Sequence, residues 1–191
     1  MKLKKEKQLG FAILEDLSVK KFGGSYLKKS NPKTARPLSV KRTMHLVIRS
    51  SKATGARSLL HKSRQVFDIM YRQSQLHGVK IYRYANGGNH LHLVILPRSA
   101  IAFKKFIRAT TGLIARLILG IERGPAKFSK TVRAQYDKSN NINFWDQRPF
   151  TRIVEWGRDF KNMCKYLMQN TLEATGFIKY KPRMTKYSST A

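Results

Sequence analysis

A glycine-rich turn, Asn86-Gly87-Gly88-Asn89, separates two segments that have the residue pattern of β-strands. Residues 79–85 begin with alternating apolar and polar side chains, and residues 90–96 contain an apolar run that ends at Pro97. Two strand patterns joined by Asn and Gly residues are typical of a β-hairpin. We therefore predict an antiparallel pair of strands at the centre of the chain, and every other element must be placed around this pair.

Helix and strand patterns follow each other on both sides of the hairpin. Apolar residues recur at helical spacing in three segments, which are residues 57–76, 101–119 and 158–172. Two further strands are predicted, at 45–49 and at 144–155, the second with an irregularity at Pro149. The order β-α-β-β-α-β-α predicts an α+β fold of ferredoxin-like kind, with an antiparallel sheet and its helices on one face.

Basic segments flank this central region. Residues 1–42 contain twelve Lys or Arg against three acidic residues and show no sustained periodicity, which predicts a flexible basic arm. Residues 43–178 form the predicted folded domain, and residues 179–191 form a basic C-terminal tail. Within the domain, residues 120–143 are predicted to be a long basic loop.

The net charge of +29 indicates the kind of partner that the chain binds. It comes from 39 Lys and Arg against 10 Asp and Glu among 191 residues, so ion pairs within the molecule leave most of the cations without an acidic partner. Such a charge exceeds what solubility requires and favours a polyanionic partner. Nucleic acid is therefore predicted, rather than a small acidic substrate.

Cysteine content and hydropathy indicate the compartment. Cys164 is the single cysteine of the sequence, so an intramolecular disulfide and a cysteine-based zinc site are both excluded. No apolar run approaches the ~18 residues of a membrane-spanning helix. We predict a cytoplasmic, nucleoid-associated protein without a membrane partner.

His90 and His92 are two residues apart on a predicted strand, so both imidazoles project from the same face. Two nitrogen donors on one face can bind one metal ion. The spacing alone also fits two ordinary strand histidines, one exposed and one hydrogen-bonded in the core, and it does not decide between these interpretations.

Tyr166 and Asn170 are four residues apart on the last predicted helix and therefore lie on one face of it, beside its apolar stripe. Taken alone, they fit a tyrosine at the rim of the core and an exposed asparagine. Together with the two histidines they supply a metal site of two imidazoles and one amide oxygen, and a phenol able to attack phosphorus.

These motifs resemble those of the single-tyrosine HUH transposases, in particular the REP-associated tyrosine transposases of bacteria. The similarity extends over residues 43–178, with Asn89-His90-Leu91-His92 on a strand and Tyr166-Leu167-Met168-Gln169-Asn170 on the last helix. It implies that His90, His92 and Asn170 bind Mg²⁺ or Mn²⁺. It also implies that Tyr166 attacks single-stranded or hairpin DNA, giving a 5′-phosphotyrosine and a free 3′-hydroxyl.

The resemblance leaves two points open. Many members continue after the asparagine with Pro and a Lys-His-Gly turn, whereas this chain has Thr171-Leu172-Glu173-Ala174-Thr175-Gly176. A homodimer is implied by the family, and no residue pattern indicates its interface.

The alternative functions are a hairpin-binding protein of the same fold without catalysis, and an unrelated basic ribonucleoprotein component.

Clustered cations predict the DNA-binding surface. They lie on the second predicted helix and in the loop after it, namely Lys104, Lys105, Arg108, Lys127, Lys130 and Arg133. Aromatic residues are candidates for stacking on unpaired bases, namely Tyr82, Tyr84, Tyr136, Phe144 and Trp145. For Phe144 and Trp145 we favour packing in the core.

Overall fold

The computed structural model describes residues 22–23, 37–120, 144–146 and 148–181. Its elements follow the predicted order, with a short strand added at the start. The strands are β1 (Phe22–Gly23), β2 (Thr43–Arg49), β3 (Val79–Asn86), β4 (His90–Pro97) and β5 (Phe150–Val154). The helices are α2 (Ser63–His77), α3 (Ala100–Leu119) and α5 (Arg158–Ala174), with a short 3₁₀ turn at Gly55–Arg57.

The strands form one antiparallel sheet in the order β1-β5-β2-β4-β3. The predicted hairpin joins β3 to β4, and Ala85 pairs with His92 close to its turn. At the edge of the sheet, β3 has a bulge between Ile81 and Arg83. The inner strands are β5, β2 and β4, and each of them pairs with a strand on both sides.

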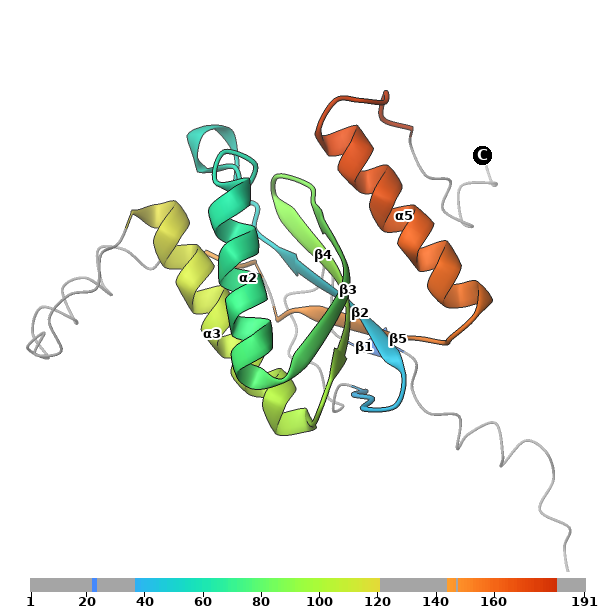
Figure 1. The fold of residues 1–191 in the computed structure, drawn as a ribbon. Coiled ribbons are helices and arrows are strands. Elements are labelled where there is room, and N and C mark those ends of the chain that lie inside the picture. The colour runs from blue at the N-terminus through green and yellow to red at the C-terminus, as the bar shows by residue number, and fades with distance from the viewer. Residues whose placement is uncertain (1–21, 24–36, 121–143, 147, 182–191) are drawn as a thin grey trace, which may run out of the picture.

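One face of the sheet carries the main hydrophobic core. Alternate residues of β4, namely Leu91, Leu93 and Ile95, face the helices α2 and α3, which lie side by side on this face (Figure 1). Phe106 of α3 is fully buried in the same cluster. This layer is the part of the fold that the helix and strand periodicity predicts.

The prediction that all helices share one face is wrong, because α5 covers the opposite face (Figure 1). There Leu167 packs with Val94 of β4 and Ala85 of β3 in a second, smaller cluster. The reason lies in β4, whose residues are apolar or buried on both sides of the strand. A strand with two buried faces needs cover on each of them.

Two element boundaries also differ from the prediction. The first helix begins at Ser63, because the preceding residues form the 3₁₀ turn and a further turn. The last strand begins at Phe150 rather than at 144, directly after Pro149, which has no backbone N–H to give to a sheet. Phe144 is buried, and Trp145 donates its Nε1–H to the carbonyl of Thr111 at 2.9 Å, so both pack in the core as favoured.

The segments outside the core of the fold are described in part. Phe22–Gly23 lies within the predicted arm and pairs with β5 at the edge of the sheet. Residues 121–143 of the predicted loop and 182–191 of the predicted tail lie outside the described residues. Among the helices that are described, none has both the length and the apolar character needed to cross a bilayer.

Candidate functional site

His90 and His92 project from the same face of β4, as their spacing predicts, and this face lies toward α5. Their ring centroids lie 4.7 Å apart and the rings are nearly perpendicular, at 89°. His92 is buried and His90 is half-buried. Two imidazoles are thus held together on the face of the sheet that α5 covers.

The hairpin turn sets the orientation of His90. Its Nδ1 lies 2.6 Å from Oδ1 of Asn89, and because an amide oxygen only accepts, Nδ1 carries the proton and Nε2 carries the lone pair. The ring also lies against the backbone of Gly87, where a Cβ would come within 2.5 Å of Nε2. Glycine at position 87 is therefore required for this ring position.

A third histidine, His45 of β2, joins the pair and was missed by the sequence analysis. Its Nε2 lies 2.9 Å from Nδ1 of His92, and the two rings are stacked at 5.1 Å and 11°. The contact arises because β2 and β4 are neighbours in the sheet and His45 is two residues from Val47, the partner of His92 in the register. In the sequence, His45 is separated from His92 by 46 residues and belongs to no motif, so only the pairing of these two strands could have identified it.

His45 is neutral at physiological pH. Burial lowers its pKa from 6.5 to about 4, and the positive charge of Arg152 acts in the same direction. Arg152 is the register partner of His45 on β5 and is itself paired with Asp159 at 2.7 Å. A neutral imidazole has one donor nitrogen and one acceptor nitrogen, so a single proton lies between His45 and His92.

This burial predicts a stability loss in acid. The unfolded chain protonates His45 near pH 6.5, while the folded chain resists protonation to about pH 4. The free energy of unfolding therefore decreases as the pH falls through this window. The expected contribution is about 2 kcal/mol between pH 7 and pH 4.5. Urea unfolding in chelator should show a smaller acid loss for His45→Gln than for the wild type, and equal losses would contradict the prediction.

Tyr166 and Asn170 lie on the side of α5 that faces the sheet. The Tyr166 ring makes edge contacts with His92, at 5.6 Å and 86°, and with His45, at 6.2 Å and 83°. Asn170 follows one turn later and is 8% exposed. The structure therefore brings the tyrosine to the histidines and buries the asparagine on the same helix face, whereas the sequence taken alone fitted an exposed asparagine.

The donor set fits a metal site of mixed nitrogen and oxygen ligands. The described residues contain no group of three His, Cys, Asp or Glu side chains arranged to hold an ion. Nε2 of His45 lies against Nδ1 of His92 at 2.9 Å. A site here would instead use His90, His92 and the amide oxygen of Asn170. Two imidazoles and one amide suit a divalent ion that accepts nitrogen as well as oxygen ligands.

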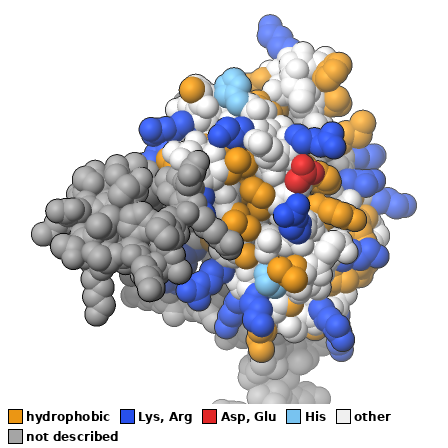
Figure 2. Space-filling view, turned by 60° about the vertical axis from the view of Figure 1, so that its left-hand side comes forward, with side chains coloured by type: hydrophobic (Ala, Val, Ile, Leu, Met, Phe, Trp, Pro, Cys, Tyr) orange, Lys and Arg blue, Asp and Glu red, His pale blue; other side chains and the backbone are white. Residues whose placement is uncertain are grey.

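The three predicted DNA-binding cations that the structure describes are not on this face. Lys104, Lys105 and Arg108 are exposed on α3, on the opposite layer from Tyr166. Figure 2, which brings the side of α2 and α3 forward, shows Lys and Arg side chains spread over this surface with little acidic surface between them. The other predicted cations, Lys127, Lys130 and Arg133, lie outside the described residues, as does Tyr136.

Comparisons with known proteins find several similar solved structures. No family model and no curated protein matches the chain. A REP-associated tyrosine transposase bound to a REP hairpin is 11% identical with a TM-score of 0.48, over 78% of this chain and 77% of that one. A candidate transposase from Deinococcus radiodurans R1 is 14% identical with a TM-score of 0.41, over 75% and 98%.

Proposed function

We propose that this protein is a transposase-like enzyme that cuts and rejoins single-stranded or hairpin DNA through a 5′-phosphotyrosine at Tyr166. The observation that carries the proposal is the packing of the Tyr166 ring against His92 and His45, on the face of the sheet that also holds His90. A phenol placed beside a cluster of imidazoles has the components of nucleophilic attack on a phosphodiester.

The bond changes balance within the DNA and one side chain. Oη of Tyr166 forms a bond to phosphorus, the bond from phosphorus to the 3′ oxygen breaks, and the phenol proton is lost while the 3′ oxygen gains one. A 3′-hydroxyl that later attacks the phosphotyrosine reverses these changes and releases Tyr166. Because one phosphodiester is exchanged for another, joining needs no external energy source.

His90, His92 and Asn170 would hold a divalent ion, which when bound supplies positive charge to the phosphate under attack. Each imidazole must present Nε2 with its lone pair. For His90 this follows from the Asn89 contact, which keeps the proton on Nδ1. For His92 the proton must lie on Nδ1, and His45 is placed to accept it at 2.9 Å.

The proposal predicts that adduct formation depends on a divalent ion. Incubation of the protein with labelled single-stranded hairpins, followed by a denaturing gel, should show a covalent protein–DNA species that disappears in chelator. Because two of the three donors are nitrogens, we expect more adduct with Mn²⁺ than with Mg²⁺ at equal concentration. Binding without any adduct, on every hairpin tested, would favour a hairpin-binding protein without catalysis.

A further inference from the structure

Three aromatic side chains form a cluster near the N-terminal end of α5 that the proposed chemistry does not use. Tyr82 belongs to β3, Trp156 lies between β5 and α5, and Phe160 belongs to the first turn of α5. The ring centroid of Trp156 lies 5.5 Å from that of Tyr82 and 5.1 Å from that of Phe160. The ring centroids of Tyr82 and Phe160 are 5.6 Å apart. We call these residues the Trp156 cluster.

Trp156 is held in place and yet exposed. Its Nε1–H donates to the carbonyl of Lys41 at 3.2 Å, so the polar atom of the indole has a partner. The side chain nevertheless leaves 48% of its surface in solvent. An indole that is oriented by its neighbours and half exposed is typical of a surface that receives a flat, apolar group.

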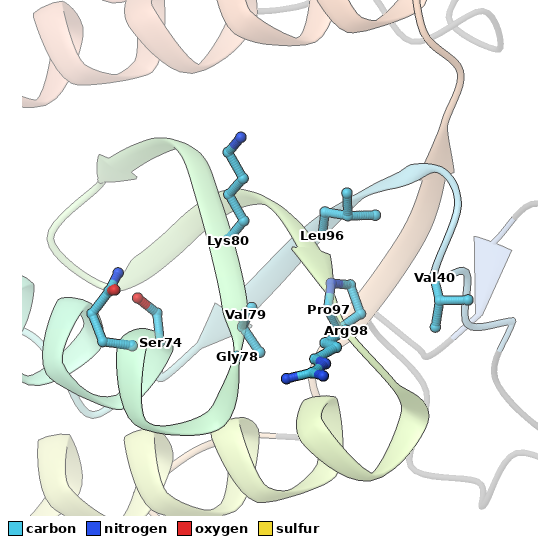
Figure 3. A pocket seen from close by; sticks show the side chains of 9 residues that line it. Val40, Ser74, Gly78, Val79, Lys80, Leu96, Pro97 and Arg98 are labelled. Atoms are coloured by element: carbon cyan, nitrogen blue, oxygen red, sulfur yellow. The ribbon is translucent and has the colours of Figure 1, made fainter.

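Several cations lie near the Trp156 cluster, and the two acidic residues beside it in the sequence, Glu155 and Asp159, are ion-paired with Arg42 and Arg152. Nζ of Lys80 lies 4.9 Å from the centroid of the Tyr82 ring. Figure 3 shows Lys80 projecting from β3 on the side of the sheet toward α5, at the rim of a pocket of about 500 Å³. Arg158 and Lys161 are exposed on the first turn of α5. Aromatic rings with cations around them suit the unpaired bases and the phosphates of a single strand.

The Trp156 cluster is continuous with the tyrosine proposed to attack DNA. Tyr82, Phe160 and Tyr166 all pack against the same small apolar group under α5. Phe160 and Tyr166 are six residues apart on one helix, which corresponds to about 9 Å along its axis. With a rise of roughly 3.4 Å per stacked nucleotide, a strand with its phosphate at Tyr166 reaches the cluster within two or three nucleotides.

The geometry points to the Trp156 cluster as a stacking site for unpaired bases of single-stranded DNA, two or three nucleotides from the bond that is cut. This inference rests on the proposed function for the identity of the ligand. The Trp156 cluster would supply a DNA contact on the same face as Tyr166. The predicted cations of α3 do not, because they lie on the other layer of the fold.

The test uses the two tryptophans of the chain. A Trp145→Phe variant leaves Trp156 as the single tryptophan, which is excited selectively over the tyrosines at long wavelength, and a Tyr166→Phe background in chelator prevents cleavage. A short oligothymidylate should quench the Trp156 fluorescence. A strand of the same length and charge with abasic sites at its centre should quench it far less, because it offers phosphates without bases to stack.

A second variant keeps the test independent of the folding of Trp145→Phe. Trp156→Leu in the otherwise unchanged chain should weaken oligothymidylate binding roughly ten-fold, while the slope of affinity against salt stays the same because every cation remains. The matched control is Phe67→Leu, at an aromatic residue that is 41% exposed on α2 in the other layer, and it should bind as the wild type does.

Two results would overturn the inference: equal quenching by the abasic strand, or equal affinity of Trp156→Leu and Phe67→Leu. Its failure is distinguishable from failure of the proposed function. If oligothymidylate quenches Trp156 but the wild type forms no adduct, the proposed chemistry is wrong and the stacking site stands. If the wild type forms an adduct but Trp156 is not quenched, the stacking site is wrong and the chemistry stands.

Discussion

A Tyr166→Phe variant is expected to form no covalent adduct with single-stranded DNA while still binding it. The substitution removes one oxygen, and that oxygen is the atom that would bond to phosphorus, so the loss should be complete rather than partial. The ring contacts of Tyr166 with His92 and His45 involve the aromatic carbons, which phenylalanine keeps. We expect a change in unfolding free energy of about 1 kcal/mol or less.

The controls for this variant separate loss of the nucleophile from other damage. Tyr71→Phe makes the same chemical change at a tyrosine that is 54% exposed on α2, in the opposite layer, and should form as much adduct as the wild type. Mass spectrometry of the digested wild-type adduct should place the nucleotide on the peptide that contains Tyr166. An adduct that persists in Tyr166→Phe, or that maps to another tyrosine, would contradict the assignment.

Local patterns in the sequence predict most of the fold because they depend on neighbouring residues. The turn at residues 86–89 predicts the β3–β4 hairpin, and helical spacing predicts α2, α3 and α5. The side of the sheet that α5 covers depends instead on the two buried faces of β4. The uninterrupted apolar run from Leu93 to Leu96 is the local sign of this burial, and it does not fit a sheet with its helices on one face.

The candidate site is predictable only where one element supplies it. His90 with His92, and Tyr166 with Asn170, are pairs set by strand and helix periodicity within one element. His45 reaches His92 through the pairing of β2 with β4, and Trp156 meets Tyr82 between the start of α5 and the edge strand. Contacts of this kind depend on the register and the order of the strands, which a single sequence does not determine.

His45→Phe is expected to lower Mn²⁺ affinity roughly 10- to 100-fold, which is the usual cost of losing a residue that orients a metal-binding histidine. Phenylalanine fills the buried position and can stack on His92 as the imidazole does, but it offers no acceptor to Nδ1. Without that acceptor, the proton of His92 is free to occupy Nε2, the nitrogen that would bind the ion.

His45→Gln is the matched variant, because its amide oxygen can accept the Nδ1 proton of His92. It should recover most of the Mn²⁺ affinity that His45→Phe loses, even where both variants unfold at similar urea concentrations. Nitrogen chemical shifts of labelled imidazoles in the metal-free protein provide a second readout. His92 should be protonated at Nδ1 in the wild type and in His45→Gln, and should shift toward Nε2 protonation in His45→Phe. Wild-type Mn²⁺ affinity in His45→Phe would mean that His45 only packs against His92, and the metal site would then depend on His90, His92 and Asn170 alone.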